Sequence, residues 1–155
     1  MNIYWFYQWC DSTRLGEWVR GNTWAFPLTE TVHIIALTVL LGSLFVIDLR
    51  LMGAKMRDLV PARMQKELHS YIDWSIVVIL ITGIMLFLSE ATKAYANAAF
   101  RPKVTLLAMA LVYHYTVHRR ALSTEKPPRW APLAGAFSLI LWFSVGAAGR
   151  AIGFV

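Results

Sequence analysis

Cysteine is almost absent from this sequence, since Cys10 is the single one among 155 residues. A lone cysteine excludes an intrachain disulfide, a cysteine-based zinc site and an iron–sulfur cluster. Charge is also scarce, because only 15% of the residues are Asp, Glu, Lys or Arg, against about 25% in soluble domains. No nucleophile–base pair, phosphate-binding loop or nucleotide-binding fingerprint is present. The composition therefore excludes an ordinary water-soluble enzyme and a disordered chain.

What the sequence does contain is apolar residues, which make up 57% of the chain and give a mean hydropathy of +0.50. They collect in four blocks, at residues 26–47, 74–89, 104–117 and 131–148. A helix needs about 20 mainly apolar residues to cross a membrane, and the two shorter blocks extend into helix-compatible flanks. We therefore expect an all-α, integral membrane four-helix bundle in a single domain, residues 1–155. Its helices are predicted at about 26–49, 62–91, 102–120 and 131–154.

The net charge of +6 comes from the segments that flank these blocks, which is typical of membrane topology rather than of nucleic-acid binding. Nine basic residues fall on the side that carries the connections between helices one and two and between helices three and four, and six fall on the other. Basic residues favour the cytoplasmic side, so both termini are predicted outside. The expected location is the bacterial inner membrane, with both termini in the periplasm and lipid as the first partner.

The start of the chain is rich in aromatic residues, including Tyr4, Trp5, Phe6 and Trp9. Trp and Tyr at this density favour the headgroup layer, where the polar edge of each ring stays hydrated. Residues 3–20 are therefore predicted to form an interfacial segment that lies on the membrane surface.

Four histidines are the best candidates for chemistry: His33, His69, His114 and His118. An ionisable residue within a membrane helix is costly and marks a functional site by default. At a rise of 1.5 Å per residue, His33 lies about 9 Å from Pro27, and His114 about 16 Å from the outer end of the third helix. His69 and His118 lie near the other ends of their helices. Each histidine alternatively serves as a hydrogen-bonding tie between helices.

Histidines on different membrane helices, with small residues beside them, are what a b-type haem requires. We expect one haem b between His33 and His114, and a second haem between His69 and His118 remains open. Lys103 and Arg150 are candidate partners for the propionates. Gly83, which shares a helix face with His69, leaves room for a flat ligand. Glu30, three residues before His33, is expected to orient the His33 ring.

Several motifs resemble a bacterial family of small four-helix membrane proteins of unknown function. They are the segment 26–33 (FPLTETVH), Gly42, the segment 48–53 (DLRLMG), Thr82-Gly83 with Phe87, residues 97–100 and Gly149-Arg150. The resemblance covers most of the chain from residue 24 onward. It implies a bacterial membrane protein with this architecture and carries over no activity.

A looser similarity extends to the membrane-type protoporphyrinogen oxidase, whose third helix resembles the run from Lys103 to His114. That similarity implies haem b and roles for His33, Lys103 and His114. The aromatic, Arg-rich stretch that follows the first-helix His in the oxidases is absent here, so it implies haem binding rather than porphyrinogen oxidation. The pattern is also similar to the copper-resistance membrane proteins of the D type.

The sequence thus favours a haem b membrane protein that transfers electrons, with a quinone or a redox protein as partner. If it is an enzyme, a membrane haem oxidoreductase is the expected class. The first alternative is the handling of copper or another metal, in which Met52, Met56 and Met64 supplement the histidines.

A second alternative is a non-catalytic helper subunit whose polar residues only join helices. A homo-oligomer is expected through the small residues of the last helix, Gly146, Gly149 and Gly153. Asp48 with Arg50, and Asp73, are expected to form ion pairs at helix ends near the membrane surface.

Overall fold

The fold is known from a computed structural model, which describes residues 3–53, 61–122 and 128–154, without the side chains of 61–65. This part of the chain is helical and contains no strand. Its elements are α1 (Tyr4–Asp11), α2 (Arg14–Gly21), α3 (Ala25–Leu51), α4 (Pro61–Ser89), α5 (Ala91–Ala96), α6 (Phe100–Tyr113), η1 (His114–His118), α7 (Arg119–Leu122) and α8 (Ala131–Ala151).

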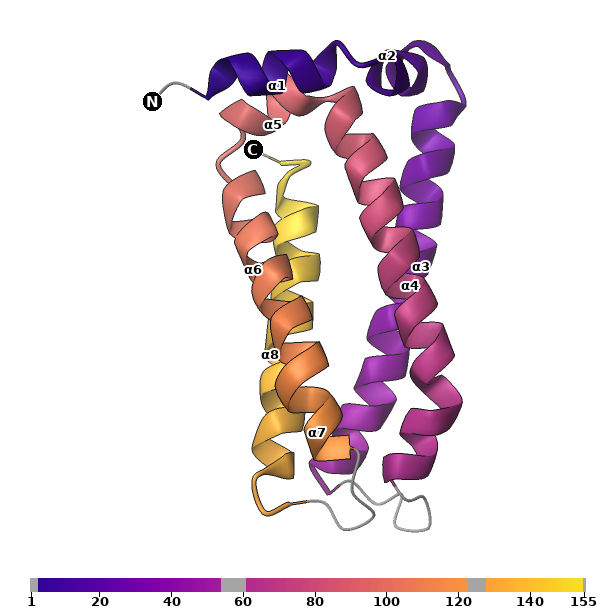
Figure 1. The fold of residues 1–155 in the computed structure, drawn as a ribbon, viewed down its shortest axis with the longest axis vertical. Helices are drawn as coiled ribbons and strands as arrows, with labels where there is room; N and C mark the ends of the chain where they lie inside the picture. The colour runs from indigo at the N-terminus through magenta and orange to yellow at the C-terminus, as the bar shows by residue number, and fades with distance from the viewer. Residues whose placement is uncertain (1–2, 54–60, 123–127, 155) are drawn as a thin grey trace.

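Four long helical runs form the bundle: α3, α4, the continuous run α6–η1–α7, and α8 (Figure 1). Helix α3 packs against both α4 and α8, and α8 packs against α6. Both termini lie at the end of the bundle that carries α1, α2 and α5, which we name the terminal end. The opposite end, where α3 and α7 end and α4 and α8 begin, is named the loop end.

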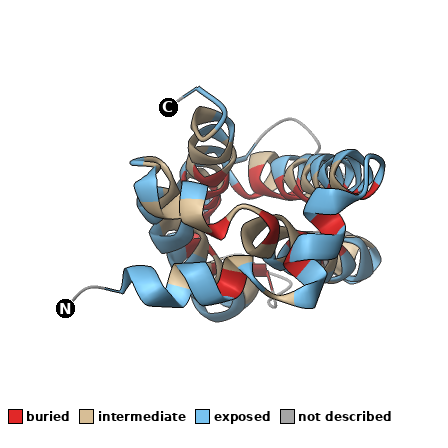
Figure 2. Ribbon diagram, turned by 90° about the horizontal axis from the view of Figure 1, so that it is seen from above, coloured by how far each residue is buried: buried red, intermediate tan, exposed pale blue. Residues whose placement is uncertain are grey.

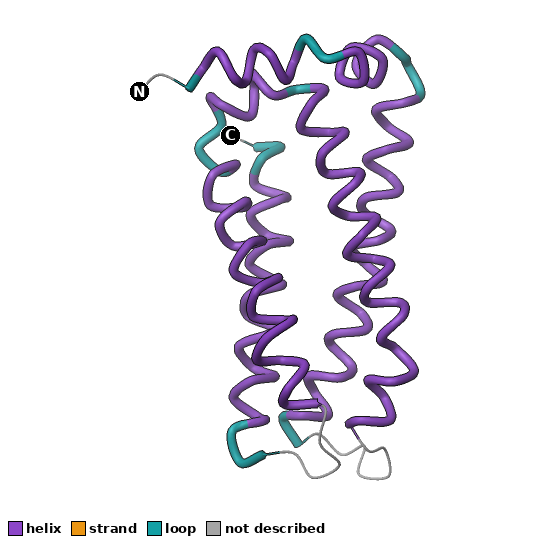
Figure 3. The backbone as a smooth tube through the Cα atoms, in the orientation of Figure 1, coloured by secondary structure: helices purple, strands orange, loops and turns teal. Residues whose placement is uncertain are grey.

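Three helices in the described part are long and apolar enough to cross a membrane, namely Ala25–Leu51, Lys66–Ser89 and Ala131–Ala151. The fourth predicted crossing is not one α-helix, because η1, a π-helical turn, separates α6 from α7. The run nevertheless extends along the bundle beside α8 (Figure 3). An all-helical membrane bundle, as the sequence predicts, is therefore what the chain forms.

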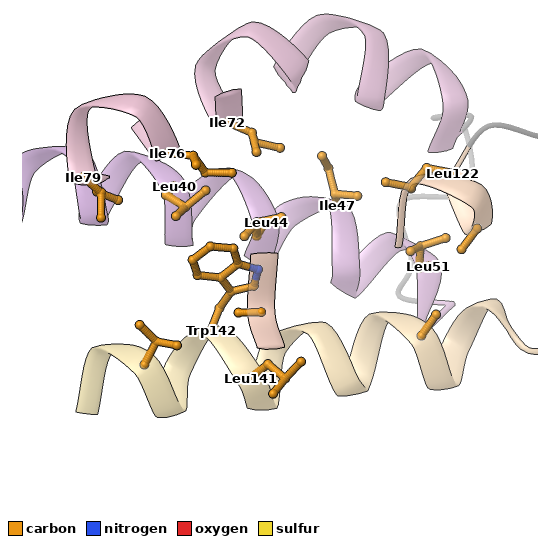
Figure 4. Packing of buried hydrophobic residues seen from close by; sticks show 14 of the residues in the cluster. Leu40, Leu44, Ile47, Leu51, Ile72, Ile76, Ile79, Leu122, Leu141 and Trp142 are labelled. Carbon is orange, nitrogen blue, oxygen red and sulfur yellow. The ribbon is translucent and has the colours of Figure 1, made fainter. Parts of the chain in front are cut away.

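The core lies along the bundle axis, where Leu40, Leu44 and Ile47 of α3 meet Ile76 of α4 and Trp142 of α8 (Figure 4). The outward faces are apolar as well, and buried residues occupy only the inner side of each helix (Figure 2). Exposed apolar side chains on these faces include Ile35, Ile81, Ile84, Val112, Leu133, Ile140 and Phe143. A helix that is apolar on all sides is suited to lipid on one side and protein on the other.

The aromatic N-terminal segment forms two short helices, α1 and α2, that lie across the terminal end (Figure 1). Thr13 caps α2 by accepting a hydrogen bond from the backbone N–H of Gly16. Arg20 of α2 donates to Asp11 at 2.7 Å and to the carbonyl of Ser89 at 3.0 Å, which ties the segment to α4. The Trp5 ring remains exposed, as the headgroup layer requires.

Gly16 is the point of closest contact between α2 and α4. A Cβ atom at this position would lie 2.3 Å from the backbone oxygen of Leu88, whereas nothing lies within 4 Å of a Cβ at Gly21. We predict that Gly16→Ala displaces α2 and destabilises the protein by about 1–3 kcal/mol, as overpacking does. Gly21→Ala in the same helix is the control and should have no such effect.

The measurement is the reaction of Cys10 with a maleimide in the purified protein. Cys10 is 2% exposed, and burial raises the pKa of its thiol, so the wild-type protein should react slowly. Displacement of α2 should make the Gly16→Ala protein react faster. Equal rates in the wild-type and Gly16→Ala proteins would contradict the contact.

Candidate functional site

The polar side chains inside the bundle form two separate groups. One lies toward the loop end and contains Asp48, His69, Asp73, His114, His118 and Arg119; we name it the loop-end network. The other lies toward the terminal end and contains His33, Thr82, Gly83, Lys103 and Gly149; we name it the His33 group. Hydrogen bonds and ring contacts join the members of the loop-end network to one another, whereas the side chain bonded to His33 is Thr82.

Asp48 and His118 form a fully buried pair at the centre of the loop-end network. His118 Nε2 and Asp48 Oδ1 share a hydrogen bond of 2.5 Å, and both side chains are 0% exposed. Ser138 of α8, also fully buried, is a further neighbour of the carboxylate. Gly135 lets α8 approach closely here, because a Cβ on it would lie 2.9 Å from the Asp48 backbone oxygen. The pair therefore joins α3 to η1 at a level where α8 closely approaches α3.

The π-helical turn η1 begins at His114 and ends at His118. It is closed by a hydrogen bond from the Arg119 N–H to the His114 carbonyl, five residues back. The two imidazole rings have centroids 5.3 Å apart and are tilted by 32°. Isolated π-helical turns within α-helices occur frequently at functional sites. This turn gives both histidines buried positions on one run, with exposed fractions of 3% and 0%.

Several polar atoms of this buried region have no hydrogen-bond partner in the described structure: Asp48 Oδ2, His114 Nδ1, His118 Nδ1, Ser138 Oγ, Trp142 Nε1 and Arg119 Nε. A buried polar group without a partner costs about 1–3 kcal/mol. Their concentration around one pair of side chains indicates that the region is suited to polar guests such as water.

Nearer the loop-end surface, Arg119 joins His69 and Asp73. Arg119 Nη2 lies 2.8 Å from both oxygens of Asp73 and 2.8 Å from His69 Nε2. Tyr115 donates to Asp73 at 3.3 Å, and the Arg119 guanidinium lies 4.7 Å from the centre of the Tyr115 ring. The His69 side chain is 44% exposed and that of Asp73 31%, so this part of the network reaches the surface.

His33 is held in one tautomer by Thr82. The Thr82 hydroxyl has one proton, which it donates to the Val78 carbonyl at 2.6 Å. The same oxygen lies 2.8 Å from His33 Nδ1, and it accepts the Nδ1–H when the hydroxyl proton is directed at Val78. The neutral ring then carries its lone pair on Nε2, to which no described residue donates. A histidine that ligates iron or another metal is typically fixed in this way.

Two glycines and a lysine complete the His33 group. A Cβ on Gly83 would lie 3.4 Å from His33 Cε1, so α4 presents bare backbone to the imidazole. A Cβ on Gly149 would lie 3.6 Å from the Lys103 ammonium nitrogen. Helices α3, α4, α6 and α8 thus each contribute to this half-buried group.

The four histidines have different neighbours in the structure from those that the sequence predicts. His33 and His114 lie in different groups, and His114 packs beside Trp142 of the core, with ring centroids 6.4 Å apart. His69 and His118 have their Nε2 atoms bonded to Arg119 and to Asp48, respectively. The partner of His33 is Thr82 rather than Glu30, which is exposed.

The structure also differs from the sequence-based expectations for Gly83, Arg150 and the glycines of α8. Gly83 faces His33 instead of His69. Arg150 is exposed at the terminal end and lies 4.5 Å from the centre of the Phe154 ring. Gly146 and Gly149 face Leu41 and Lys103 of the same chain, whereas Gly153 is exposed, and the homo-oligomer stays a prediction. Among the described residues, no three His, Cys, Asp or Glu side chains are arranged to hold a metal ion.

Sequence reasoning missed Asp48, which it assigned to an ion pair at the membrane surface. The 23 residues of helix that precede Asp48 span about 35 Å, which is more than the hydrocarbon thickness of a membrane, so helix length alone places this carboxylate near the far surface and gives no signal of its buried partner. Thr82 was noticed only as part of a motif, since a threonine in a helix normally bonds its own backbone. Met56 and Met64, which were candidates for copper, lie outside the described side chains, and Met52 is exposed.

Removal of one partner of the buried pair should be strongly destabilising. We predict that Asp48→Ala, which leaves His118 Nε2 buried without a partner, lowers the free energy of unfolding by about 3–5 kcal/mol. The control is Glu90→Ala, which breaks an exposed pair with Lys93 and should cost less than about 1 kcal/mol. Denaturation of the purified proteins by sodium dodecyl sulfate measures both. Similar losses for the two variants would mean that Asp48 is solvated.

Comparison with known proteins finds no match among curated proteins and none among solved structures. It does find a family described only as being of unknown function, DUF6644, whose sequence pattern matches residues 6–155. That span includes every residue of the loop-end network and of the His33 group. The chain therefore belongs to the DUF6644 family.

Proposed function

We propose that the protein binds one haem b in the terminal half of the bundle, with His33 as an axial ligand, and that it transfers electrons in the membrane. The observation that carries this proposal is the 2.8 Å contact between His33 Nδ1 and Thr82 Oγ1, in which we assign the proton to Nδ1 because the hydroxyl also contacts the Val78 carbonyl. It leaves Nε2, the usual iron-binding nitrogen, free of any described donor.

The side chains around His33 fit a porphyrin in three respects. Gly83 and Gly149 let the His33 ring and the Lys103 side chain lie directly against helix backbone, which sets the positions of a ligand and of a cation. The Lys103 ammonium is available to pair with a propionate. The rings of Phe87 and Phe100 stack at 5.4 Å with an angle of 11°, which adds flat apolar surface at the same end. A bound haem b would supply one-electron chemistry between ferric and ferrous iron.

The residues around the site would orient the ligand, supply positive charge and hold the bundle in lipid. Thr82 holds the imidazole in one orientation and makes Nε2 more basic, because the Nδ1–H is engaged in a hydrogen bond. Lys103 provides a positive charge near the terminal end, where Arg101 and Arg150 are exposed. Apolar side chains on every outward face keep this half of the bundle in lipid.

A single haem is proposed because the other three histidines have different surroundings. His118 is bonded to Asp48 and His69 to Arg119, and His114 lies against the core. No arrangement in the described part favours the copper alternative. The orientation inferred from the basic residues, with both termini on the periplasmic side of the bacterial inner membrane, is part of the proposal, as is a quinone or redox protein partner.

The test is the absorption spectrum of the detergent-purified protein, air-oxidised and then reduced with dithionite. His33→Ala should lose most of the Soret band, because no other free Nε2 lies in this group. His69→Ala, which removes a histidine of the loop-end network, is the matched control and should keep it. Full haem content in His33→Ala would contradict the assignment.

The Thr82→Val variant tests whether the hydrogen bond from His33 to Thr82 contributes to haem binding. Valine has nearly the same shape but cannot accept the Nδ1–H, so the ring should lose its fixed orientation. We expect a loss of haem affinity of about 10–100-fold, the usual effect of removing such a partner, measured by haem titration. Thr38→Val on α3, where the hydroxyl bonds only the Ile34 carbonyl, is the control.

Carbon monoxide binding tests whether His33 is the one residue of this chain that would hold the iron. Because one imidazole is available in the His33 group, the reduced haem should bind carbon monoxide, with the spectral shift that follows. A haem held by two histidines would resist carbon monoxide. An unchanged spectrum under carbon monoxide would therefore require a second ligand from elsewhere.

A further inference from the structure

We propose that the loop-end network is a proton path, which connects solvent at the loop end with the buried Asp48–His118 pair. The path lies in the other half of the bundle from the His33 group, so this inference does not depend on a haem. Its residues come from four different helical segments: α3, α4, η1 and α7.

The entrance lies where the network reaches the surface. The side chains of Asp73 and Arg119 are each 31% exposed, and that of His69 is 44% exposed. The hydrogen bonds of Arg119 hold the Asp73 carboxylate and the His69 ring side by side. A proton that arrives from solvent thus meets two groups able to accept it.

The second step is a cavity of about 10 Å³ behind these side chains. It is lined by His69, Ile72, Asp73, His114, Arg119 and Leu122. A volume of this size holds one water molecule, and the lining supplies the two or more polar partners that a buried water needs. A water here would join the surface side chains to His114, which is 3% exposed.

The final step runs along η1 to Asp48. The rings of His114 and His118 are 5.3 Å apart, and each has a buried Nδ1 without a partner. A water molecule between the two Nδ1 atoms would join them. His118 would accept a proton at Nδ1 and release one from Nε2 to Asp48 Oδ1, 2.5 Å away. Each transfer moves one proton, and no electron is involved.

The groups that face the Asp48–His118 pair come from every element packed around it. The rings of Tyr113 of α6 and His114 of η1 lie beside the His118 ring, and Ser138 of α8, which does not titrate, lies beside the Asp48 carboxylate. His69 and Asp73 of α4 and Arg119 of α7 line the cavity next to His114. A purely structural tie between helices would not need a water-sized cavity or a second unpartnered histidine. These two features favour a path over a tie.

The experiment is exchange of the imidazole Cε1 hydrogens in deuterium oxide, read by mass spectrometry on the purified full chain. This exchange requires that the ring be protonated and that water reach it. The path predicts measurable exchange at His114 and His118, although both are buried. No measurable exchange at His114 and His118 while His69 exchanges would overturn the proposal.

A matched pair of variants tests the route. Ile72→Phe fills the cavity and should slow exchange at His114 and His118 by about tenfold or more, leaving His69 and His33 unchanged. Ile79→Phe makes the same substitution in the same helix and core, away from the cavity, and should leave the ratios unchanged. Equal effects of the two substitutions would contradict the route.

If Ile72→Phe does not fold, Asp73→Asn replaces it, with Glu90→Gln at the terminal end as control. The asparagine keeps the shape of the side chain but cannot carry a proton between solvent and the cavity. Slower exchange at His114 and His118 in Asp73→Asn, but not in Glu90→Gln, supports the path. Unchanged exchange in both variants would contradict it.

Discussion

The hydrogen bond between Asp48 and His118 is the constraint on which the rest of the bundle depends. Lipid offers no partner to a carboxylate, so Asp48 must find one inside the protein. His118 supplies it at 2.5 Å, and this fixes the position of η1 relative to α3. At the same level of the bundle, Gly135 lets α8 approach α3 closely. Because this polar contact holds α3 and η1 in register, it also restricts how the core residues around Trp142 pack.

The two halves of the bundle differ because of where the polar groups and the small residues lie. Toward the loop end, buried groups with unfilled hydrogen-bonding capacity surround the pair and lead to the surface through Asp73. Toward the terminal end, His33 and Lys103 are half-buried and face glycine backbone. A porphyrin site in one half and a proton path in the other would place electron and proton chemistry within a single small bundle.

The helices could be predicted from sequence because hydropathy and the need to satisfy every backbone group in lipid leave few alternatives. Pairing of side chains could not. The face of a helix predicts the direction in which a histidine points, but not which residue of a neighbouring helix lies at the same level. The sequence therefore pairs His33 with His114, although the two lie in different groups. The π-helical turn at His114 has no composition signal of its own, and it changes which side chains share a face beyond Tyr113. The role of Thr82 depends on one hydrogen bond across helices, which no spacing within α4 reveals.

The measurement that tests the central claim most directly is the pyridine haemochrome assay of the purified wild-type protein, expressed as haem per chain. The account predicts a b-type haem and a ratio near one. A ratio near two would contradict the single site at His33, and a colourless protein, still colourless after growth with added haem precursor, would contradict haem binding itself.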